Sequence, residues 1–501
     1  MTSPDFGYWL TGTLVVYIAV VSFLGYLGMK RTKTVKDFAL AGQAASPLIL
    51  GLALYATWHS ISAYMGSPGL AYNFGWPSMW QPWAIILIQP ILLILLAGRI
   101  RTYAKKLNVL SAIDLIGERF QSHLLRVVFA LVTVVTMTMY CVSQYKGAGL
   151  IFSNVFGTEF WVGVVIAAAV VMFYMSTGGA WADIYTDAFQ GVLMILIVLI
   201  MVPVSLIAAG GYATASANLA AIKPELAGIF YPGTLYDSWA PITISLYFTV
   251  LFFGNPLFPN RVMALKDKKH VARFIILFAI GNFLGAWFQQ VGALGRSMGV
   301  AVSTADFITP QLMINLLPVP LAAILIVGIL AAMMSSVDGY ANAAAVSAGN
   351  DVYRRIWTQV LHRPDDAKID RRAVLIMRIV TIVVLGVPIY WVVVAPPPFL
   401  SLFIYYAGGF LVSSVCAPFL VGLLWKGATK LGAYAAVICG LAGFELLDIF
   451  MNKMTVWAKG VSGAAISFAA ILLVSYIENK FFGGRTLPRE ALKKLAGTAE
   501  A

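Results

Sequence analysis

Charged residues are scarce in this sequence. Asp, Glu, Lys and Arg make up only 11% of its 501 residues, whereas 60% are hydrophobic, and that balance excludes an ordinary soluble domain. Cysteine is also rare. Cys141, Cys416 and Cys439 all lie in apolar runs, which excludes both a disulfide framework and a cysteine metal motif. We therefore predict a membrane protein that crosses the bilayer several times.

Motifs of catalysis are missing as well. The sequence has no His-Glu-x-x-His pair, no phosphate-binding loop, and no Ser, His and Asp on adjacent polar loops. Of its four histidines, His123, His270 and His362 fall in connections that we expect to be cytoplasmic. We expect no enzyme activity, with an integral-membrane transferase as the alternative.

Long apolar runs dominate the chain. A run of about 18 to 25 residues crosses a bilayer as a helix, and we count about thirteen. Residues 1–10 lack the positive charges that open a cleaved signal peptide, so we expect the first run to remain in the mature protein. The runs lie near residues 8–29, 46–71, 78–98, 124–156, 161–178, 183–209, 240–260, 272–296, 318–351, 373–395, 399–425, 431–452 and 456–477.

The net charge of +13 follows a clear pattern. Nearly all of the 34 Lys and Arg residues fall in alternate connections, at 30–36, 99–126, 261–273, 354–378, 426–430 and 478–501. Because such residues stay on the cytoplasmic side, we predict an outside N-terminus and a cytoplasmic C-terminus in the plasma (cell inner) membrane. Topology accounts for the basicity, so the expected partners are membrane lipid and a small solute, and no nucleic acid.

Two of the runs are interrupted. Residues 56–69 combine small hydroxyl residues and His59 with Pro68 and Gly69, and residues 254–259 hold two prolines and a glycine. Each interruption opens a group of five runs, and an odd number of spans inverts the second group. Paired breaks in two inverted halves are typical of a secondary transporter, with the binding site at the breaks.

These pieces resemble the sodium:solute symporter family over nearly the whole chain. The similarity is carried by residues 37–42, 65–69, 178–179, Thr186, Asp187, Gln190 and 331–336. Within the family, residues 261–269 and 292–296 are most similar to the sodium/pantothenate symporters.

The resemblance implies an all-α membrane protein with a LeuT-like 5+5 inverted repeat. The implied parts are a leading helix at 1–30, a first repeat at 46–209, a second repeat at 240–425, two trailing helices at 431–477 and a cytoplasmic tail at 478–501. It also implies a sodium ion held by the carbonyls of Ala56, His59 and Ala332 and by the hydroxyls of Ser335 and Ser336. Family members thought to bind a second sodium carry hydroxyls at the places of Ala332, Asp338 and Gly339. This chain does not, so we predict no second ion of that form.

Several of these residues have a second interpretation. Ser335 and Ser336 could simply pack helices together. Asp187 could charge the start of a helix, whereas the resemblance makes it a relay for sodium leaving inward; Asp183 is then the interfacial acid. Asp338 could join the ion path or bond across helices. His59 could carry protons or be a packed, neutral side chain.

Lys146 is a charge inside an apolar run, which makes it a functional candidate. It could pair with a solute carboxylate, or its stem could let the charge reach the outer interface. The other residues that we assign to the solute are Gln144, Ser60, Tyr64, Phe253, Asn255 and Tyr406. Trp58, Gln81 and Tyr405 could also line the cavity, and any of these could be packing.

The sequence thus predicts a sodium-coupled symporter that imports a small organic anion, such as pantothenate or another monocarboxylate. The alternatives are a proton-coupled or sodium-coupled carrier of an amino acid or other polar solute, and a membrane sensor that transports nothing.

The substitution Lys146→Met tests the carboxylate interpretation. If the ammonium pairs with the solute, its loss raises the apparent KM for the solute far more than that for sodium in an uptake assay. Equal effects on the two constants would reject this role.

Overall fold

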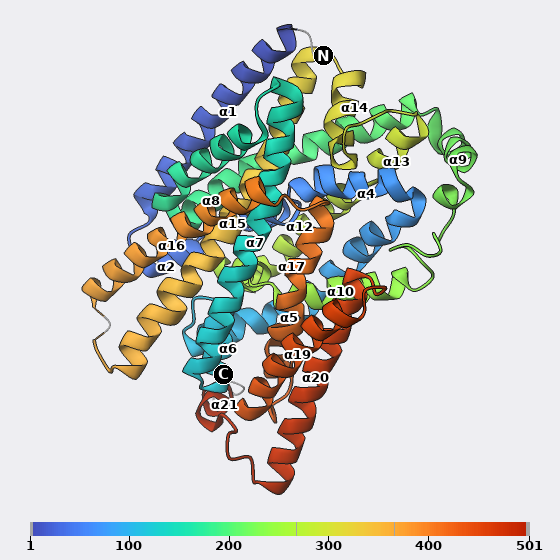
Figure 1. Cartoon of the computed structure of the whole chain (residues 1–501). Coiled ribbons are helices and arrows are strands. Elements are labelled where there is room, and N and C mark those ends of the chain that lie inside the picture. Colours follow the sequence, from blue (N-terminus) through green and yellow to red (C-terminus); the bar gives the residue numbers. More distant parts are fainter. Residues whose placement is uncertain (1–3, 267, 365, 497–501) are drawn as a thin grey trace.

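The computed structural model describes residues 4–266, 268–364 and 366–496. Over these residues the chain is a bundle of helices without a named strand, and one isolated bridge joins Ala45 to Leu265. The leading helix α1 and the trailing pair α19 and α20 lie on opposite flanks of the bundle (Figure 1).

The α-helices are α1 (Pro4–Arg31), α2 (Val35–Leu40), α3 (Pro47–Trp58), α4 (Ser67–Phe74), α5 (Trp80–Leu107), α6 (Ala112–Phe120), α7 (His123–Phe156), α8 (Phe160–Ala208), α9 (Gly211–Ile222), α10 (Ala240–Gly254), α11 (Leu257–Ala264), α12 (Val271–Trp287), α13 (Gln290–Ser297), α14 (Ile308–Leu316), α15 (Val319–Val346), α16 (Ala367–Val394), α17 (Leu400–Ser414), α18 (Cys416–Leu424), α19 (Lys430–Phe450), α20 (Val456–Phe481) and α21 (Arg489–Ala496). Short 3-10 or π-helical turns are η1 (Ala41–Gln43), η2 (Ser62–Gly66), η3 (Trp76–Met79), η4 (Pro224–Ala227), η5 (Lys268–His270), η6 (Ala305–Phe307), η7 (Ser347–Arg354) and η8 (Ile356–Val360).

The apolar runs become helices where the sequence places them. In the described part of the chain, 9 helices are long and apolar enough to cross a membrane, or up to 12 segments if each of 3 bent pairs is one span. Residues 160–173 form a further, shorter apolar helix. These segments coincide in position with the runs found in the sequence.

Both expected interruptions are sharp bends. α3 and the segment 62–74 meet at 57°, and α10 and α11 meet at 51°. A third bend, of 42° between α17 and α18, was not expected. Its cause is Pro418, which cannot donate a hydrogen bond to the carbonyl of Ser414 and whose ring crowds that carbonyl.

The expected fifth and sixth runs are joined within one long helix, α8, which kinks at Gly179 (φ 53°, ψ −150°). This backbone conformation is open to glycine and costly for other residues. A Cβ atom at Gly179 would also lie 2.7 Å from the Phe38 ring. The kink therefore requires glycine at this position.

α15 is the central helix. It packs against α1, α3, α7, α8 and α16, and 78% of its most apolar window is buried, compared with 22% for α1. Its contact with α3 places the hydroxyls of Ser335 and Ser336 against the first break.

Candidate functional site

α3 breaks because the amide groups of the residues that follow it donate to side-chain oxygens instead of to helix carbonyls. The Ile61 N–H donates to Gln144 Oε1 at 3.3 Å, and the Ser62 N–H donates to Ser60 Oγ at 3.1 Å. His59 therefore ends the helix with φ −85° and ψ 75°. The carbonyls of the last helical turn are left available to other donors.

Two serines of α15 take up these carbonyls. Ser335 Oγ donates to the Ala56 carbonyl at 2.9 Å, and Ser336 Oγ donates to the Thr57 carbonyl at 3.0 Å. Both hydroxyls also lie 3.0–3.2 Å from the Ala332 carbonyl. Five neutral oxygens thus converge where the broken helix meets α15, and oxygen ligands suit a hard cation such as sodium.

This arrangement differs from the implied ion site at one position. Four of the five expected residues, Ala56, Ala332, Ser335 and Ser336, are brought together. The hydroxyl of Ser336 bonds to the carbonyl of Thr57, a residue that we had not assigned to the ion. The side chain of His59 makes a separate contact. Its Nε2 lies 2.9 Å from Asn282 Oδ1, and its ring stacks at an angle on Tyr55.

A buried ion cluster lies directly beside this point. Asp187 Oδ2 accepts hydrogen bonds from Thr57 Oγ1 and Arg261 Nη2, both at 2.7 Å. Arg261 also reaches Asp183 Oδ1 at 3.1 Å. All four side chains are buried. A buried guanidinium between two carboxylates offsets the large cost of removing each charge from water.

Two expectations need correction here. Asp183 is not interfacial, because it is buried against Arg261. Arg261 is not part of an exposed cytoplasmic loop, because α11 carries it into the bundle. The sequence did contain a signal for this burial, because Arg261 follows closely after the Pro/Gly break at residues 254–259. Asp338, for its part, lies 3.4 Å from the Thr186 hydroxyl of α8 and so bonds across helices.

A cavity of about 70 Å³ adjoins the break. Ser60 and Asn255, which we had assigned to the solute, line it together with Trp58, Gln81 and Tyr405. Gln81 donates to the hydroxyls of Ser67 (3.2 Å) and Tyr405. Because ligand pockets usually enclose about 300–1,000 Å³, the structure shows the cavity in a closed form.

The other candidates have different surroundings, and their assignment to the solute stays a prediction. Gln144 supports the break at Ile61. The Tyr64 hydroxyl lies 2.6 Å from that of Tyr55. Phe253 stacks edge-on with Phe252, and Tyr406 packs between Phe410 and Phe444.

Lys146 already has partners in this structure. Its Nζ lies 2.8 Å from Asp306 Oδ2 and 2.9 Å from the Pro398 carbonyl, and it is buried rather than exposed at an interface. Burial raises the pKa of Asp306 above its ordinary value, and the nearby ammonium acts in the opposite direction. Asp306 also accepts from the Leu400 N–H at 3.3 Å. The pair thus ties α7 to η6 and to the start of α17.

Two opposed broken helices around a cavity, in a bundle of membrane-spanning helices, define a secondary transporter. The family is also clear. The chain belongs to the sodium:solute symporter family, whose model matches residues 38–440. Membership implies sodium as the coupled ion.

Curated relatives span nearly the full chain. The osmoregulated proline transporter OpuE of Bacillus subtilis (strain 168) is 27% identical, covering 97% of each chain. The sodium/pantothenate symporter of Escherichia coli (strain K12) is 26% identical, covering 95% of this chain and 97% of its own. These relatives are thus named as transporters, the class that the paired interruptions and the family resemblance led us to expect.

Among solved structures, a Na+-coupled sialic acid symporter matches with a TM-score of 0.78 at 20% identity, covering 94% of this chain and 98% of its own. This similarity shows the fold. The all-α, LeuT-like fold class expected from the sequence is confirmed.

The pair Lys146–Asp306 can be tested by a double-mutant cycle. Lys146→Met and Asp306→Asn should each destabilise the protein by about 3–5 kcal/mol, because each leaves a buried charge unpaired. The double variant should lose less free energy of unfolding than the two single variants lose together. The measurement is unfolding of the purified protein.

The pair Lys459–Asp448, at 2.7 Å, is the matched control, because its carboxylate is partly exposed to solvent. In the same double-mutant cycle, the coupling energy between Lys459 and Asp448 should stay within about 1 kcal/mol. Additive losses at Lys146 and Asp306 would show that the two charges do not stabilise each other.

Proposed function

We propose that this protein couples the inward flow of sodium to the uptake of a small solute that carries a carboxylate. The observation that carries the proposal is the contact between Ser335 and Ser336 of α15 and the carbonyls at the broken end of α3. Each hydroxyl satisfies a carbonyl that the break leaves free, and these are oxygens of the kind that a hard cation such as sodium binds.

Sodium would replace hydrogen bonds at this point. A serine hydroxyl that donates to a carbonyl can rotate and present a lone pair instead. The ligands are then the carbonyls of Ala56 and Ala332 and the hydroxyls of Ser335 and Ser336, with the carbonyl of Thr57 or His59 completing the set. Neutral oxygens leave the ion's charge uncompensated by the protein, so the ion can be released inward.

Asp187 is suited to the release step. Thr57 contributes its carbonyl to the proposed ion site and its hydroxyl to Asp187. A sodium ion that leaves toward the cytoplasm would meet this carboxylate next. Arg261 holds the acid in place while no sodium is near it, and it would share the acid with the ion during release.

The solute would bind in the cavity beside the break, which must widen from its closed form. Ser60, Asn255, Gln81 and Tyr405 offer hydrogen bonds, and Trp58 offers an aromatic face. The relatives named for proline and for pantothenate both suggest a carboxylate, and they favour neither solute over the other. Lys146 could meet such a carboxylate only after it leaves Asp306.

We also infer the orientation in the membrane. Lys106 of α5 donates to the Leu495 carbonyl of α21 at 3.2 Å, and Arg355 pairs with Asp114 of α6. Three of the basic segments, 99–126, 354–378 and 478–501, thus gather at one end of the bundle. The positive-inside rule makes this end cytoplasmic, which places the N-terminus outside. We also propose that residues 46–209 and 240–425 are the two inverted repeats.

Uptake into proteoliposomes tests the function. We expect an inward sodium gradient to drive accumulation of labelled pantothenate or proline, and a potassium gradient of equal size to drive none. Uptake driven by a proton gradient without sodium would overturn sodium coupling and favour a role for His59 in proton transfer. Accumulation of neither solute under a sodium gradient would overturn the carboxylate proposal.

The substitution Ser336→Ala tests the ion site. Loss of one ligand worth about 1.4 kcal/mol should raise the sodium concentration for half-maximal uptake about tenfold. Ser347→Ala is the matched control, because that buried hydroxyl bonds only within its own helix, to the Ala343 carbonyl. If both variants keep the sodium dependence of the unmodified protein, the ion does not bind at Ser336.

A further inference from the structure

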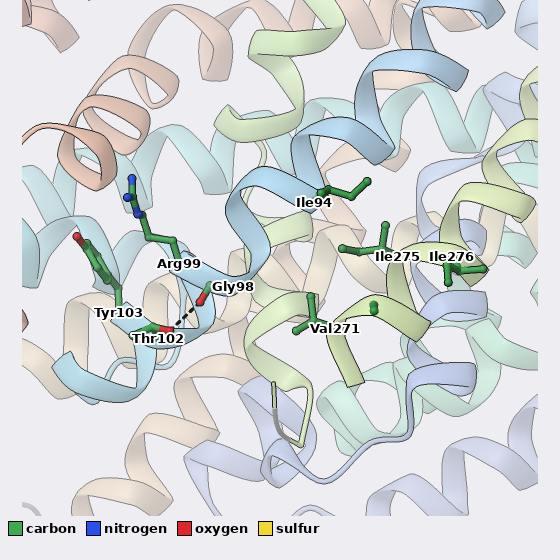
Figure 2. Close-up of a pocket in the computed structure, with 9 residues that line it drawn as sticks. Ile94, Gly98, Arg99, Thr102, Tyr103, Val271, Ile275 and Ile276 are labelled. Carbon is green, nitrogen blue, oxygen red and sulfur yellow. Dashed lines mark hydrogen bonds between the residues drawn. The ribbon is translucent and has the colours of Figure 1, made fainter. Parts of the chain in front are cut away.

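A hollow of about 740 Å³ lies between α5 and α12. Figure 2 shows Ile94 of α5 facing Val271 and Ile275 of α12 across it, with Arg99 and Tyr103 further along α5. This hollow is separate from the cavity beside the break of α3, and the transport cycle proposed above does not use it.

The hollow opens onto the lipid-facing surface. Ile94 and Ile276, which line it, are 67% and 58% exposed. They continue exposed apolar rows on the same two helices, through Leu87 and Ile91 on α5 and Ile280 on α12. α5 is long enough to span a membrane, and so is α12 together with α13. Hydrocarbon chains therefore surround the opening.

Small residues create the hollow. A Cβ atom added at Gly98 would meet nothing within 4 Å, and Ala272 lines the opposite wall on α12. Larger side chains at these two places would fill the space between the helices. Gly98 and Ala272 thus keep the hollow open beside Arg99.

Positive charge gathers at one end of the hollow. Arg99 is exposed and lines it, and Arg273 is exposed at the start of α12. Neither α5 nor α12 contains an Asp or Glu. This is the end of α5 that we assign to the cytoplasmic side, where bilayers carry anionic lipids.

We propose that this hollow binds an anionic phospholipid of the cytoplasmic leaflet. The Arg99 guanidinium pairs with the lipid phosphate, since its fork of N–H donors matches phosphate oxygens. Tyr103 lies at headgroup level, where tyrosine is enriched. One acyl chain follows the apolar wall past Gly98 to Ile94 and Ile275.

The test measures the unfolding temperature of the delipidated, detergent-purified protein, and it compares the effect of added phosphatidylglycerol with that of added phosphatidylcholine. We expect phosphatidylglycerol to raise the unfolding temperature more than phosphatidylcholine does. Arg99→Gln should remove that difference. Gly98→Leu, whose Cβ atom would meet nothing within 4 Å, should fill the hollow and remove it as well.

Two matched variants serve as controls. Lys105→Gln removes an exposed charge from the same helix outside the hollow. Gly12→Leu places a side chain in open space on α1, where a Cβ atom also meets nothing within 4 Å. Both should keep the full preference for phosphatidylglycerol.

Three outcomes would overturn the proposal. The first is an equal response of the unmodified protein to both lipids. The second is an Arg99→Gln or Gly98→Leu variant that retains the preference. The third is an equal shift with glycerol 3-phosphate, because a headgroup without acyl chains would mark a site for soluble phosphates. Variants that fail to fold are recognised by their unfolding temperature without lipid, and Ala272→Phe then fills the hollow from the other wall.

Discussion

The structure depends on one constraint: inside a bilayer, the backbone groups freed by a helix break must find partners within the protein. α3 can stop at Trp58 because Gln144 accepts from the Ile61 N–H and because α15 supplies two hydroxyls for the carbonyls of Ala56 and Thr57. The groups that make the break tolerable are also the groups that a sodium ion could use. Stability of the break and the proposed ion site would thus be two consequences of the same contact, which α15 makes.

Buried charges follow the same rule. Arg261 lies between Asp183 and Asp187 next to the proposed ion site, and Lys146 lies against Asp306, which also bonds to the start of α17. Each pair joins different helices, so a movement of those helices must separate or exchange partners. Such pairs add little stability compared with apolar packing. They do specify which helices meet, and a carrier that alternates between two arrangements needs contacts of that kind.

The scaffold and the solute are determined by different parts of the chain. Relatives named for proline and for pantothenate share the family over nearly their whole lengths, so the bundle accommodates more than one cargo. The cavity that would select the solute is lined by a small set of residues, among them Ser60, Gln81, Asn255 and Tyr405. A fold of this kind therefore does not decide its solute. In our proposal, the side chains around the break select the solute.

The sequence by itself determined the positions of the membrane helices, the two expected breaks and the family, because long apolar runs, Pro/Gly interruptions and short local motifs are properties of neighbouring residues. It also brought Ser335 and Ser336 to attention through the resemblance. Only the tertiary structure decided that Thr57 meets Ser336, that Arg261 turns inward to Asp183 and Asp187, and that Lys146 pairs with Asp306. Each of these pairings joins residues that lie 74 to 279 positions apart, and hydropathy along a chain contains no information on which faces of two distant helices touch.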